Sequence, residues 1–225
     1  MIVYKIENFL KGKVKIYVKD FTEDQAKYIN SSNYLCFLYT KELFKYKIKE
    51  NEELSDENFN KIIKNQYERT NNKCVGLLER SFKTKKDLER KLILAGYNQF
   101  VTLYTIDKME EYGYVNDREF AEHYFESYKN KKSISFIKQT LKQKGVSSEI
   151  IEEIIDNDFN QDDIVMKLID KKLKGKDWDD LDFKEKYKIK SYIYSKGYKL
   201  PSNLKWAKGS LFYFKKFWNF SKSKT

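Results

Sequence analysis

Near the middle of the chain stands the motif Gly113-Tyr114-Val115-Asn116-Asp117-Arg118-Glu119-Phe120-Ala121, which is followed by Leu141-Lys142-Gln143-Lys144-Gly145-Val146. Gly113 can take the left-handed conformation that ends a helix, and Asn116 is a favourable N-cap for the next helix. Asp117 and Glu119 fall in the first turn of that next helix, where the helix dipole favours negative charge. The first motif therefore predicts the end of one helix and the start of another, and Gly145 predicts a further end.

The residues between the two motifs have the period of a helical hairpin. The first predicted helix carries its apolar side chains on one face, namely Phe120, Ala121, Tyr124, Phe125 and Tyr128. The second predicted helix places Ile134, Ile137 and Leu141 inward, and it leaves Lys138 and Lys142 outward. We therefore expect two amphipathic helices joined by a short turn.

This ordered series resembles the RecX family, whose members read Gly-Tyr-Ile-Asp-Asp-x-x-Phe-Ala, then Gly-x-x-x-Ile, then Glu-Leu-x-x-Lys-Gly-Ile. The chain differs where Asn116 replaces an Asp but keeps a capping side chain, Ser133 replaces a Gly and Thr140 replaces a Glu. The resemblance implies a mainly α-helical fold of tandem three-helix repeats, which a subgroup of the family precedes with a small β-rich extension. It also implies a non-catalytic regulator that binds RecA recombinase filaments on DNA and alters their ATP hydrolysis, strand exchange and part in DNA repair and the SOS response.

The composition suits a mostly helical soluble protein. Of the 225 residues, 40% are hydrophobic, 16% aromatic and 35% charged, with one Pro and eight Gly, which disfavours a turn-rich β-sandwich. No run reaches the ~20 apolar residues of a membrane span, and no signal peptide is visible. Cys36 and Cys74 lack Cys-x-x-Cys spacing, so we expect reduced, buried thiols in a cytoplasmic protein.

Residues 1–50 alternate in hydrophobicity at the period of β-strands. The alternating runs are Ile2, Tyr4 and Ile6, and then Val14, Ile16 and Val18. They predict a hairpin, and the apolar run from Tyr34 to Tyr39 predicts a third strand. Thr40 then caps a short predicted helix over Lys41 to Tyr46, whereas residues 21–33 fit neither pattern and resemble an insertion.

Helical signals take over from Ser55, which is a favourable N-cap. Thr84 starts a further predicted helix that ends at Gly96, and another runs from there to Gly113. Between Ser55 and Thr84 we expect two helices, the second beginning at about Tyr67. Their inward residues are Phe59, Ile62 and Ile63 in the first, and Val75 and Leu78 in the second.

An internal repeat connects these helices. Gly96, Gly145 and Gly197 recur at near-equal spacing, and each follows a pair of apolar residues one helical turn apart. The pairs are Leu88 with Leu92, Ile137 with Leu141, and Ile189 with Ile193. We expect these glycines to end equivalent helices, with positive φ, in three stacked repeats. The predicted division of the chain is 1–54, 55–114, 115–158 and 159–225.

The sequence lacks the usual catalytic motifs. His123 is the only histidine, so a tetrahedral zinc site would lack its ligands, and neither a phosphate-binding P-loop nor a nucleophile elbow occurs. The acidic pairs Asp162-Asp163 and Asp179-Asp180 stand at predicted helix starts, where the dipole accounts for them. We therefore predict no catalytic, cofactor-binding or metal-binding residue and no small-molecule substrate.

Basic residues recur at equivalent positions of the repeats. Relative to the glycine that ends each helix, Lys138 is equivalent to Lys190, and Lys144 is equivalent to Lys196. The first repeat has two cations close to these positions. With one more lysine on the central helix they predict a stripe that suits DNA phosphates or an acidic protein groove. The alternative is a solvated face of a lysine-rich protein. The predicted residues are Arg90, Lys91, Lys138, Lys142, Lys144, Lys190 and Lys196.

Positive charge accumulates at the C-terminal end. The net charge is +11, and residues 183–225 hold twelve Lys against the single acid Glu185. Lys215 and Lys216 are further predicted partner-binding residues, since they lie within an aromatic run. This tail could stack on bases of single-stranded DNA, at ~1–3 kcal/mol each, or dock on an anionic membrane. It could instead complete the core of the third repeat, which we favour for Leu211 and Phe214.

These patterns and the resemblance predict a monomeric regulator whose partners are the RecA filament and, weakly and without sequence preference, DNA. The alternative is a nucleic-acid-binding protein that acts without RecA. A third interpretation is a peripheral membrane protein that uses the basic aromatic tail.

Overall fold

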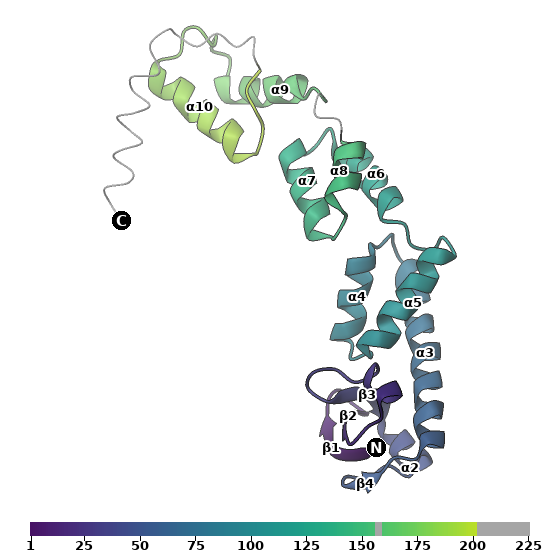
Figure 1. Cartoon of the computed structure of the whole chain (residues 1–225). Helices are drawn as coiled ribbons and strands as arrows, with labels where there is room; N and C mark the ends of the chain where they lie inside the picture. The colour runs from purple at the N-terminus through teal and green to yellow at the C-terminus, as the bar shows by residue number, and fades with distance from the viewer. Residues whose placement is uncertain (156–158, 202–225) are drawn as a thin grey trace. The chain divides into compact units, whose positions relative to one another are not determined.

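The computed structural model describes residues 1–155 and 159–201, which are mainly helical and begin with a small antiparallel sheet (Figure 1). This architecture confirms the predicted fold class. The described residues form two compact units: the larger unit comprises residues 1–124 and 140–154, and the smaller unit comprises residues 125–139 and those from 155 onward. The division into four consecutive segments stays a prediction.

The sheet has the strand order β3-β2-β1-β4. Its strands are β1 Ile2–Asn8, β2 Lys13–Lys19, β3 Tyr34–Tyr39 and β4 Glu52–Glu53. The first three strands confirm the predicted hairpin and third strand. The sequence does not reveal β4, because two residues are too few to show an alternation.

A β-bulge at Tyr4 changes which side chains of β1 enter the core. Val3 pairs with Val18 and Ile6 pairs with Ile16, with a shift in register between the two pairs. Residues three positions apart therefore face the core together. Val3 is buried, whereas Tyr4 is only half-buried, so the strict alternation predicted along β1 does not hold.

Residues 21–33 form one turn of helix, α1 Glu23–Ala26, and a tight loop that leads into β3. Asn30 shapes that loop, because its Oδ1 accepts hydrogen bonds from the backbone N–H groups of Ser32 and Tyr34, each at 3.0 Å. An asparagine that satisfies the backbone ahead of it is a common way to fix a turn. The predicted insertion is thus an ordered connection between β2 and β3.

Helix α2, Thr40–Lys45, follows β3 without a loop. Tyr39 occupies the N-cap position, and its N–H donates to the Glu42 carboxylate at 2.9 Å. The prediction that Thr40 caps this helix is wrong by one residue. Glu42 is the third helical residue, and its carboxylate accepts the backbone N–H of the N-cap residue Tyr39, as in a capping box.

A single helix, α3 Asp56–Leu78, spans 23 residues where the sequence predicts two helices. Ser55 caps it as expected, with its Oγ accepting from the Asn58 N–H at 3.3 Å. The predicted start of a second helix near Tyr67 is wrong, because no Pro or Gly interrupts the chain there.

The buried face of α3 becomes polar half-way along the helix. Beyond Ile63 the buried positions are Gln66, Thr70 and Cys74. Gln66 Nε2 donates to the Phe37 carbonyl at 2.9 Å, and Thr70 Oγ1 donates to the Gln66 carbonyl at 2.6 Å. Val75 is 38% exposed, so its predicted inward position is wrong. A hydrophobic pattern cannot reveal a buried face made of hydrogen-bonded polar side chains.

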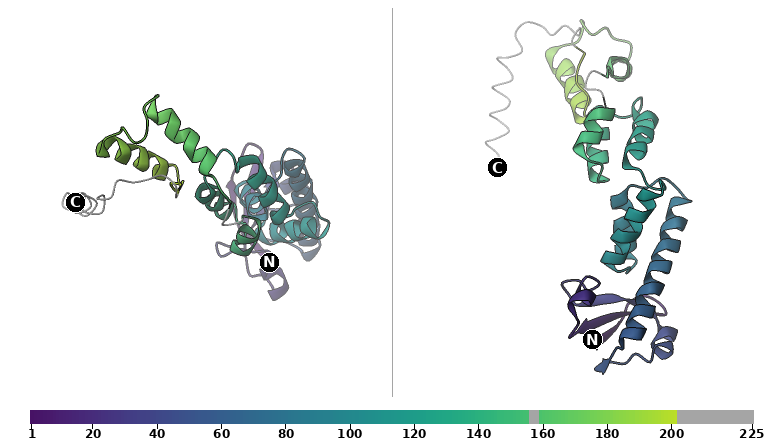
Figure 2. Two further views of the ribbon diagram at one scale, coloured as in Figure 1. Left: turned by 90° about the horizontal axis from the view of Figure 1, so that it is seen from above. Right: turned by 45° about the vertical axis from the view of Figure 1, so that its right-hand side comes forward.

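Helix α3 runs beside the sheet and beside the next two helices (Figures 1 and 2), and its residues belong to two apolar clusters of the larger unit. Its first half packs against the sheet, where Ile16, Leu35 and Ile62 are fully buried. Its second half packs against α4, Lys85–Leu94, and α5, Gln99–Glu111. Helix α3 therefore packs against both the sheet and helices α4 and α5 of the first repeat.

Two side-chain amides close the outer edge of β3. Asn98 Nδ2 donates to the Leu35 carbonyl at 2.6 Å, and Gln66 Nε2 donates to the Phe37 carbonyl at 2.9 Å. Alternate carbonyls of an edge strand point away from the sheet and attract further strands when they are open. These amides occupy both carbonyls, so β3 is attached to α3 and α5 instead of being available for strand addition.

The remaining helices form the tandem three-helix repeats. The second half of α3 with α4 and α5 makes the first repeat, α6 to α8 make the second, and α9 and α10 begin the third. Their bounds are α6 Asp117–Tyr128, α7 Ile134–Gln143, α8 Ser148–Ile154, α9 Asp162–Leu173 and α10 Phe183–Ser195. Leu211 and Phe214, which are predicted to complete the core of the third repeat, lie outside the described residues.

The second helix of each repeat ends in the same way. Gly96, Gly145 and Gly197 have φ of 88°, 88° and 81°, which confirms the predicted left-handed ends. In each case the glycine N–H bonds to the carbonyl three residues back, and the next N–H bonds to the carbonyl five residues back. These are the paired hydrogen bonds of a Schellman motif. The paired apolar residues before each glycine are buried.

The smaller unit has its own core and its own polar tie. Its buried apolar residues come from α9, α10 and the segment between them, and they include Val165, Ile169, Leu181, Ile189 and Ile193. Gln161, just before α9, donates from Nε2 to the carbonyls of Lys129 and Lys132, both at 2.9 Å. Its Oε1 accepts from the Ile134 N–H at 3.0 Å. One side chain thus joins the start of α9 to the start of α7.

Candidate partner-binding surface

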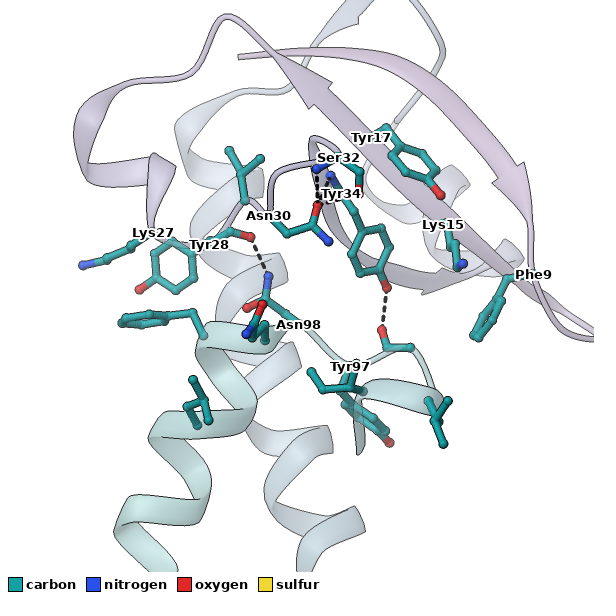
Figure 3. Close-up of a pocket in the computed structure, with 17 residues that line it drawn as sticks. Phe9, Lys15, Tyr17, Lys27, Tyr28, Asn30, Ser32, Tyr34, Tyr97 and Asn98 are labelled. Carbon is teal, nitrogen blue, oxygen red and sulfur yellow. Dashed lines mark hydrogen bonds between the residues drawn. The ribbon is translucent and has the colours of Figure 1, made fainter. Parts of the chain in front are cut away.

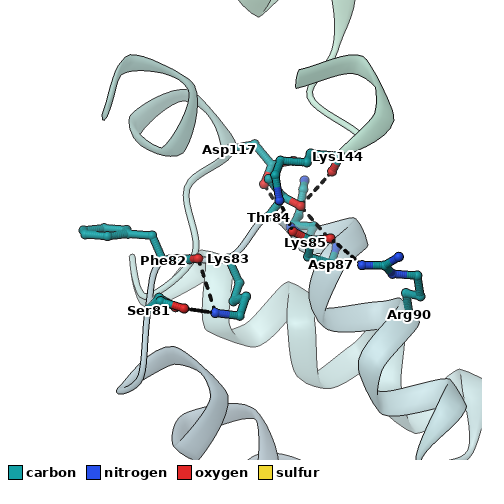
Figure 4. Close-up of polar contacts among 9 residues, drawn as sticks. All are labelled: Ser81, Phe82, Lys83, Thr84, Lys85, Asp87, Arg90, Asp117 and Lys144. Atoms are coloured by element: carbon teal, nitrogen blue, oxygen red, sulfur yellow. Dashed lines mark hydrogen bonds and ion pairs between the residues drawn. The ribbon is translucent and has the colours of Figure 1, made fainter. Parts of the chain in front are cut away.

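The first turn of α4 contacts two other elements of the larger unit (Figure 4). Thr84 caps α4: its Oγ1 accepts from the Asp87 N–H at 3.1 Å and donates to the Lys144 carbonyl at 2.7 Å. The Lys85 N–H donates to Asp117 Oδ1, on the first residue of α6, at 2.9 Å. Burial raises the pKa of the Asp117 carboxyl, and the hydrogen bond from Lys85 opposes that rise. The start of α4 therefore holds both the start of α6 and the turn after α7.

Asp87 is the anionic centre of this surface. Its carboxylate is mostly buried and pairs with Lys144 Nζ at 2.8 Å and with Arg90 Nη2 at 3.2 Å. The Lys144 ammonium also lies 5.3 Å from the centroid of the Phe120 ring. A lysine held by both a carboxylate and an aromatic ring has a fixed position. Lys144 therefore attaches the turn after α7 to α4.

Cations outnumber this carboxylate. Burial is the largest cause that lowers the pKa of the Lys83 ammonium, and the positive charges of Lys91 and Lys144 lower it further, against the opposing effect of Asp87. Lys83 Nζ donates to the Ser81 carbonyl at 3.0 Å. Lys86 lies against Gly145, next to Lys144 in the chain. We name this group the α4 basic cluster: Lys83, Lys86, Arg90, Lys91 and Lys144.

The α4 basic cluster can bind an anion without reading a sequence. Lys91 and Arg90 are exposed on α4, and Lys86 is exposed in its first turn. Pairing with Asp87 neutralises part of the charge, and the excess remains available to phosphates or carboxylates. Lysine and arginine contacts to a phosphate backbone add affinity and orientation but carry no base specificity.

Three of the sequence-predicted residues meet in this cluster. Arg90 and Lys144 pair with Asp87, and Lys91 lies close enough to Lys83 for its charge to lower the pKa of the Lys83 ammonium. Lys144 is half-buried. Lys142 is exposed at the end of α7. Lys83 and Lys86 fall outside the positions that the repeat pattern selects. The sequence signal for these two residues is the concentration of lysines around the Thr84 cap. The turn that contains Lys144 packs on this helix start, so these lysines come close to Lys144.

The other predicted lysines of the described residues belong to the smaller unit. Lys138 lines a cavity of about 330 Å³ together with Gln161 and Tyr198. Lys190 Nζ lies 5.6 Å from the centroid of the Tyr194 ring, and Lys196 Nζ lies 5.8 Å from that of Tyr192. The smaller unit thus carries basic and aromatic side chains of its own. Lys215 and Lys216 lie outside the described residues.

The histidine lies at the surface, and the cysteines lie in the interior. His123 is 63% exposed in its side chain, and its ring centroid lies 5.2 Å from that of Phe82. Both cysteines are free and buried, and burial raises the pKa of the Cys74 thiol to about 11 and raises that of Cys36 as well. Both thiols are therefore protonated at neutral pH, as expected for buried hydrophobes. Among the described residues, no group of three potential ligands could hold a metal ion, and no helix is long and apolar enough to cross a bilayer.

Comparison with known sequences identifies similar proteins over most of the chain. A family described as RecX, second three-helix domain, matches residues 116–155. The regulatory protein RecX of Clostridium tetani (strain Massachusetts / E88) is 30% identical over 176 residues, which cover 76% of this chain and 81% of that protein. The regulatory protein RecX of Clostridium beijerinckii (strain ATCC 51743 / NCIMB 8052) is 25% identical over 190 residues, which cover 82% of this chain and 88% of that protein.

Solved structures share the fold. A crystal structure of regulatory protein RecX superimposes with a TM-score of 0.56 at 19% identity, covering 88% of this chain and 94% of that chain. The crystal structure of RecX from Lactobacillus salivarius gives a TM-score of 0.50 at 23% identity, covering 60% of this chain and 90% of that chain. At these identities the likeness concerns the arrangement of helices alone.

Proposed function

The chain belongs to the RecX family of regulatory proteins, and on that premise we propose that it binds the filament of RecA recombinase on DNA. In this proposal it acts in the cytoplasm as a monomer, without catalysis of its own, and it lowers the filament's ATP hydrolysis and strand exchange. The observation that carries the proposal is the 30% identity to the Clostridium tetani regulatory protein over 81% of that relative's length.

The α4 basic cluster supports a nucleoprotein filament as the partner. A recombinase on DNA repeats the same protein surface and the same phosphate spacing many times. Exposed cations such as Lys86 and Lys91 can contact such an array in any DNA sequence. The smaller unit contributes Lys138, Lys190 and Lys196 to the proposed contacts. Several weak contacts made by one chain multiply their effects when they engage together.

The direct test measures RecA-dependent ATP hydrolysis on single-stranded DNA with less of this protein than of RecA. We expect the hydrolysis rate to fall under these conditions. The double variant Lys83→Glu/Lys91→Glu should raise the half-inhibitory concentration about tenfold or more, since two reversed contacts of about 1 kcal/mol each change affinity by at least that factor. Circular dichroism should report an unchanged helical signal.

A matched control separates the cluster from net charge. Lys41 on α2 and Lys64 on α3 are exposed lysines of the same unit, and Lys41→Glu/Lys64→Glu changes the net charge equally. We expect this control to inhibit as the parent does. Equal losses in the two double variants would remove the α4 basic cluster from the proposal. A pull-down with RecA that fails both with and without nuclease treatment would contradict the filament as partner.

One observation favours a second candidate, which is nucleic-acid binding without RecA. Residues 183–225 hold twelve Lys and one acidic residue, and such a segment binds phosphates by itself. A protein that only coats DNA must cover it before it slows RecA. Inhibition that requires DNA-saturating amounts, and that a single-strand-coating protein reproduces at the same coverage, would support this second candidate.

A further inference from the structure

A second surface of the larger unit lies between the sheet and the helices of the first repeat. It is a cavity of about 530 Å³ (Figure 3). One wall comes from β2 and the 27–34 loop, and the opposite wall comes from the turn between α4 and α5 and the first residues of α5. We name it the sheet–helix pocket. Its size is within the range of sites that accept a small ligand or a few side chains of a partner.

Hydrogen bonds fix the walls of the sheet–helix pocket (Figure 3). Asn98 Nδ2 donates to the Leu35 carbonyl at 2.6 Å and also to the Tyr28 carbonyl. The Tyr34 hydroxyl donates to the Gly96 carbonyl. Asn30 holds the loop through its Oδ1, as described above. Residues from both walls are therefore linked to each other by hydrogen bonds.

Aliphatic side chains are left exposed beside this pocket. Leu94 is 75% exposed, Leu103 is 41% exposed and Ile93 is 38% exposed, and all three line the pocket. A single exposed leucine needs no explanation, but neighbouring apolar side chains around a concave site mark binding surfaces. Covering these side chains with an apolar partner surface would remove apolar area from water and favour binding.

The charge of the lining has one sign. Lys15 and Lys27 are its charged residues, and no Asp or Glu lines the pocket. Lys15 Nζ lies 4.6 Å from the centroid of the Phe9 ring, and Lys27 Nζ lies 5.2 Å from that of Tyr28. Apolar side chains flanked by two cations complement a ligand with an apolar centre and acidic ends.

We propose that the sheet–helix pocket binds an extended segment of a partner protein, which inserts a leucine or aromatic side chain and carries acidic residues on both sides of it. The insert packs on Leu94 and Leu103, and the flanking carboxylates face Lys15 and Lys27. This site is separate from the α4 basic cluster, and it does not depend on the function proposed above.

The aromatic rings of the pocket favour a peptide over stacked bases. Tyr28 meets Phe100 edge-on, with ring centroids 5.0 Å apart, and Tyr34 meets Tyr17 edge-on at 5.6 Å. Lys27 also lies over the Tyr28 ring, and Lys15 lies over the Phe9 ring. Base stacking needs open ring faces along a groove. Exposed aliphatic side chains, as at Leu94, instead suit an apolar anchor.

The test uses a fluorescein-labelled synthetic peptide with a central Leu-Phe pair and two Glu on either side. Fluorescence anisotropy with the full chain should show saturable binding. Leu94→Glu should weaken it about tenfold or more, as loss of an apolar anchor does. Lys15→Gln/Lys27→Gln should weaken it about fivefold and reduce its salt dependence. The same peptide with Gln in place of Glu should bind the parent chain correspondingly less.

Matched variants outside the pocket serve as controls. Phe44 is 81% exposed on α2 and does not line the pocket, so Phe44→Glu should bind the peptide as the parent does. Lys41→Gln should do the same. Absence of saturable binding to the parent, or equal losses in Leu94→Glu and Phe44→Glu, would overturn the proposal. Displacement of the peptide by a thymidine oligonucleotide that itself binds Leu94→Glu more weakly would assign the pocket to nucleic acid instead.

Discussion

The hydroxyl of Thr84 donates a 2.7 Å hydrogen bond to the carbonyl of Lys144, 60 residues further along the chain. The same hydroxyl caps α4, because it accepts the Asp87 N–H. A helix cap in the first repeat thus also receives the helix end of the second repeat. In the smaller unit, Ser133 caps α7 and lies against Gly197, where an added Cβ would come within 2.6 Å of its Oγ. The contact between successive repeats is therefore itself repeated.

Thr84→Val should destabilise the protein by about 2–3 kcal/mol, because it removes both a helix cap and a buried hydrogen bond while keeping the shape of the side chain. Thr84→Ser keeps the hydroxyl and should cost less than about 1 kcal/mol. Urea unfolding followed by circular dichroism measures both. A Val variant as stable as the Ser variant would show that the hydrogen bond to Lys144 contributes nothing.

Gly145→Ala should destabilise the protein more than Gly113→Ala does. Both glycines have positive φ, which costs an alanine about 1–2 kcal/mol. Only at Gly145 would the new Cβ meet a neighbour, the Lys86 Cβ at 2.6 Å, whereas nothing lies within 4 Å at Gly113. We expect the difference to be about 1–3 kcal/mol. Equal melting temperatures for the two variants would contradict the close contact between α4 and the turn after α7.

Asp117→Asn should change how stability depends on pH. Because burial raises the pKa of the Asp117 carboxyl, the folded chain binds that proton more tightly than the unfolded chain does. The resulting stabilisation is complete below the unfolded pKa of about 3.9 and is lost as the pH rises through the folded pKa. Parent stability relative to Asp117→Asn should therefore fall between acidic and neutral pH. Asp163→Asn, at an exposed position in the first turn of α9, is the control, and a matching fall there would refute the assignment.

Removing residues 210–225 deletes Lys215, Lys216, Lys222 and Lys224. If these lysines contact phosphate, the slope of log affinity against log salt for single-stranded DNA should become shallower by up to ~3. A variant with Gln at the four positions keeps the aromatic residues and should show the same change. Unchanged slopes in both variants would mean that the tail serves packing or a membrane.

The sequence predicts elements well where one physical signal acts alone. Caps at Ser55, Thr84 and Asn116 appear where expected, since each satisfies its own helix start. The glycine ends are found for the same reason. The continuity of α3 is missed because Gln66 and Thr70 are buried as hydrogen-bonded polar residues, and the partner of Gln66, the Phe37 carbonyl, lies 29 residues away in the chain.

The candidate surface shows the same limit. Spacing along helices selects Arg90, Lys91 and Lys144, but it cannot reveal that Lys144 is paired with Asp87, which is 57 residues away. Lys83 precedes its helix and has no place in a helical period. Pairing and proximity across repeats depend on how the helices pack, and a single sequence does not contain that information in a local pattern.

Gly96 ends its helix as Gly145 and Gly197 do, but its neighbour is different. A Cβ at Gly96 would lie 2.6 Å from the Phe9 ring, next to the sheet, and not against a helix cap. The β-sheet therefore occupies the place that an earlier repeat would fill, and it terminates the series at that end. A chain built in this way can gain or lose whole repeats by duplication or deletion beyond Gly96, while the amino-terminal sheet that closes the series stays the same.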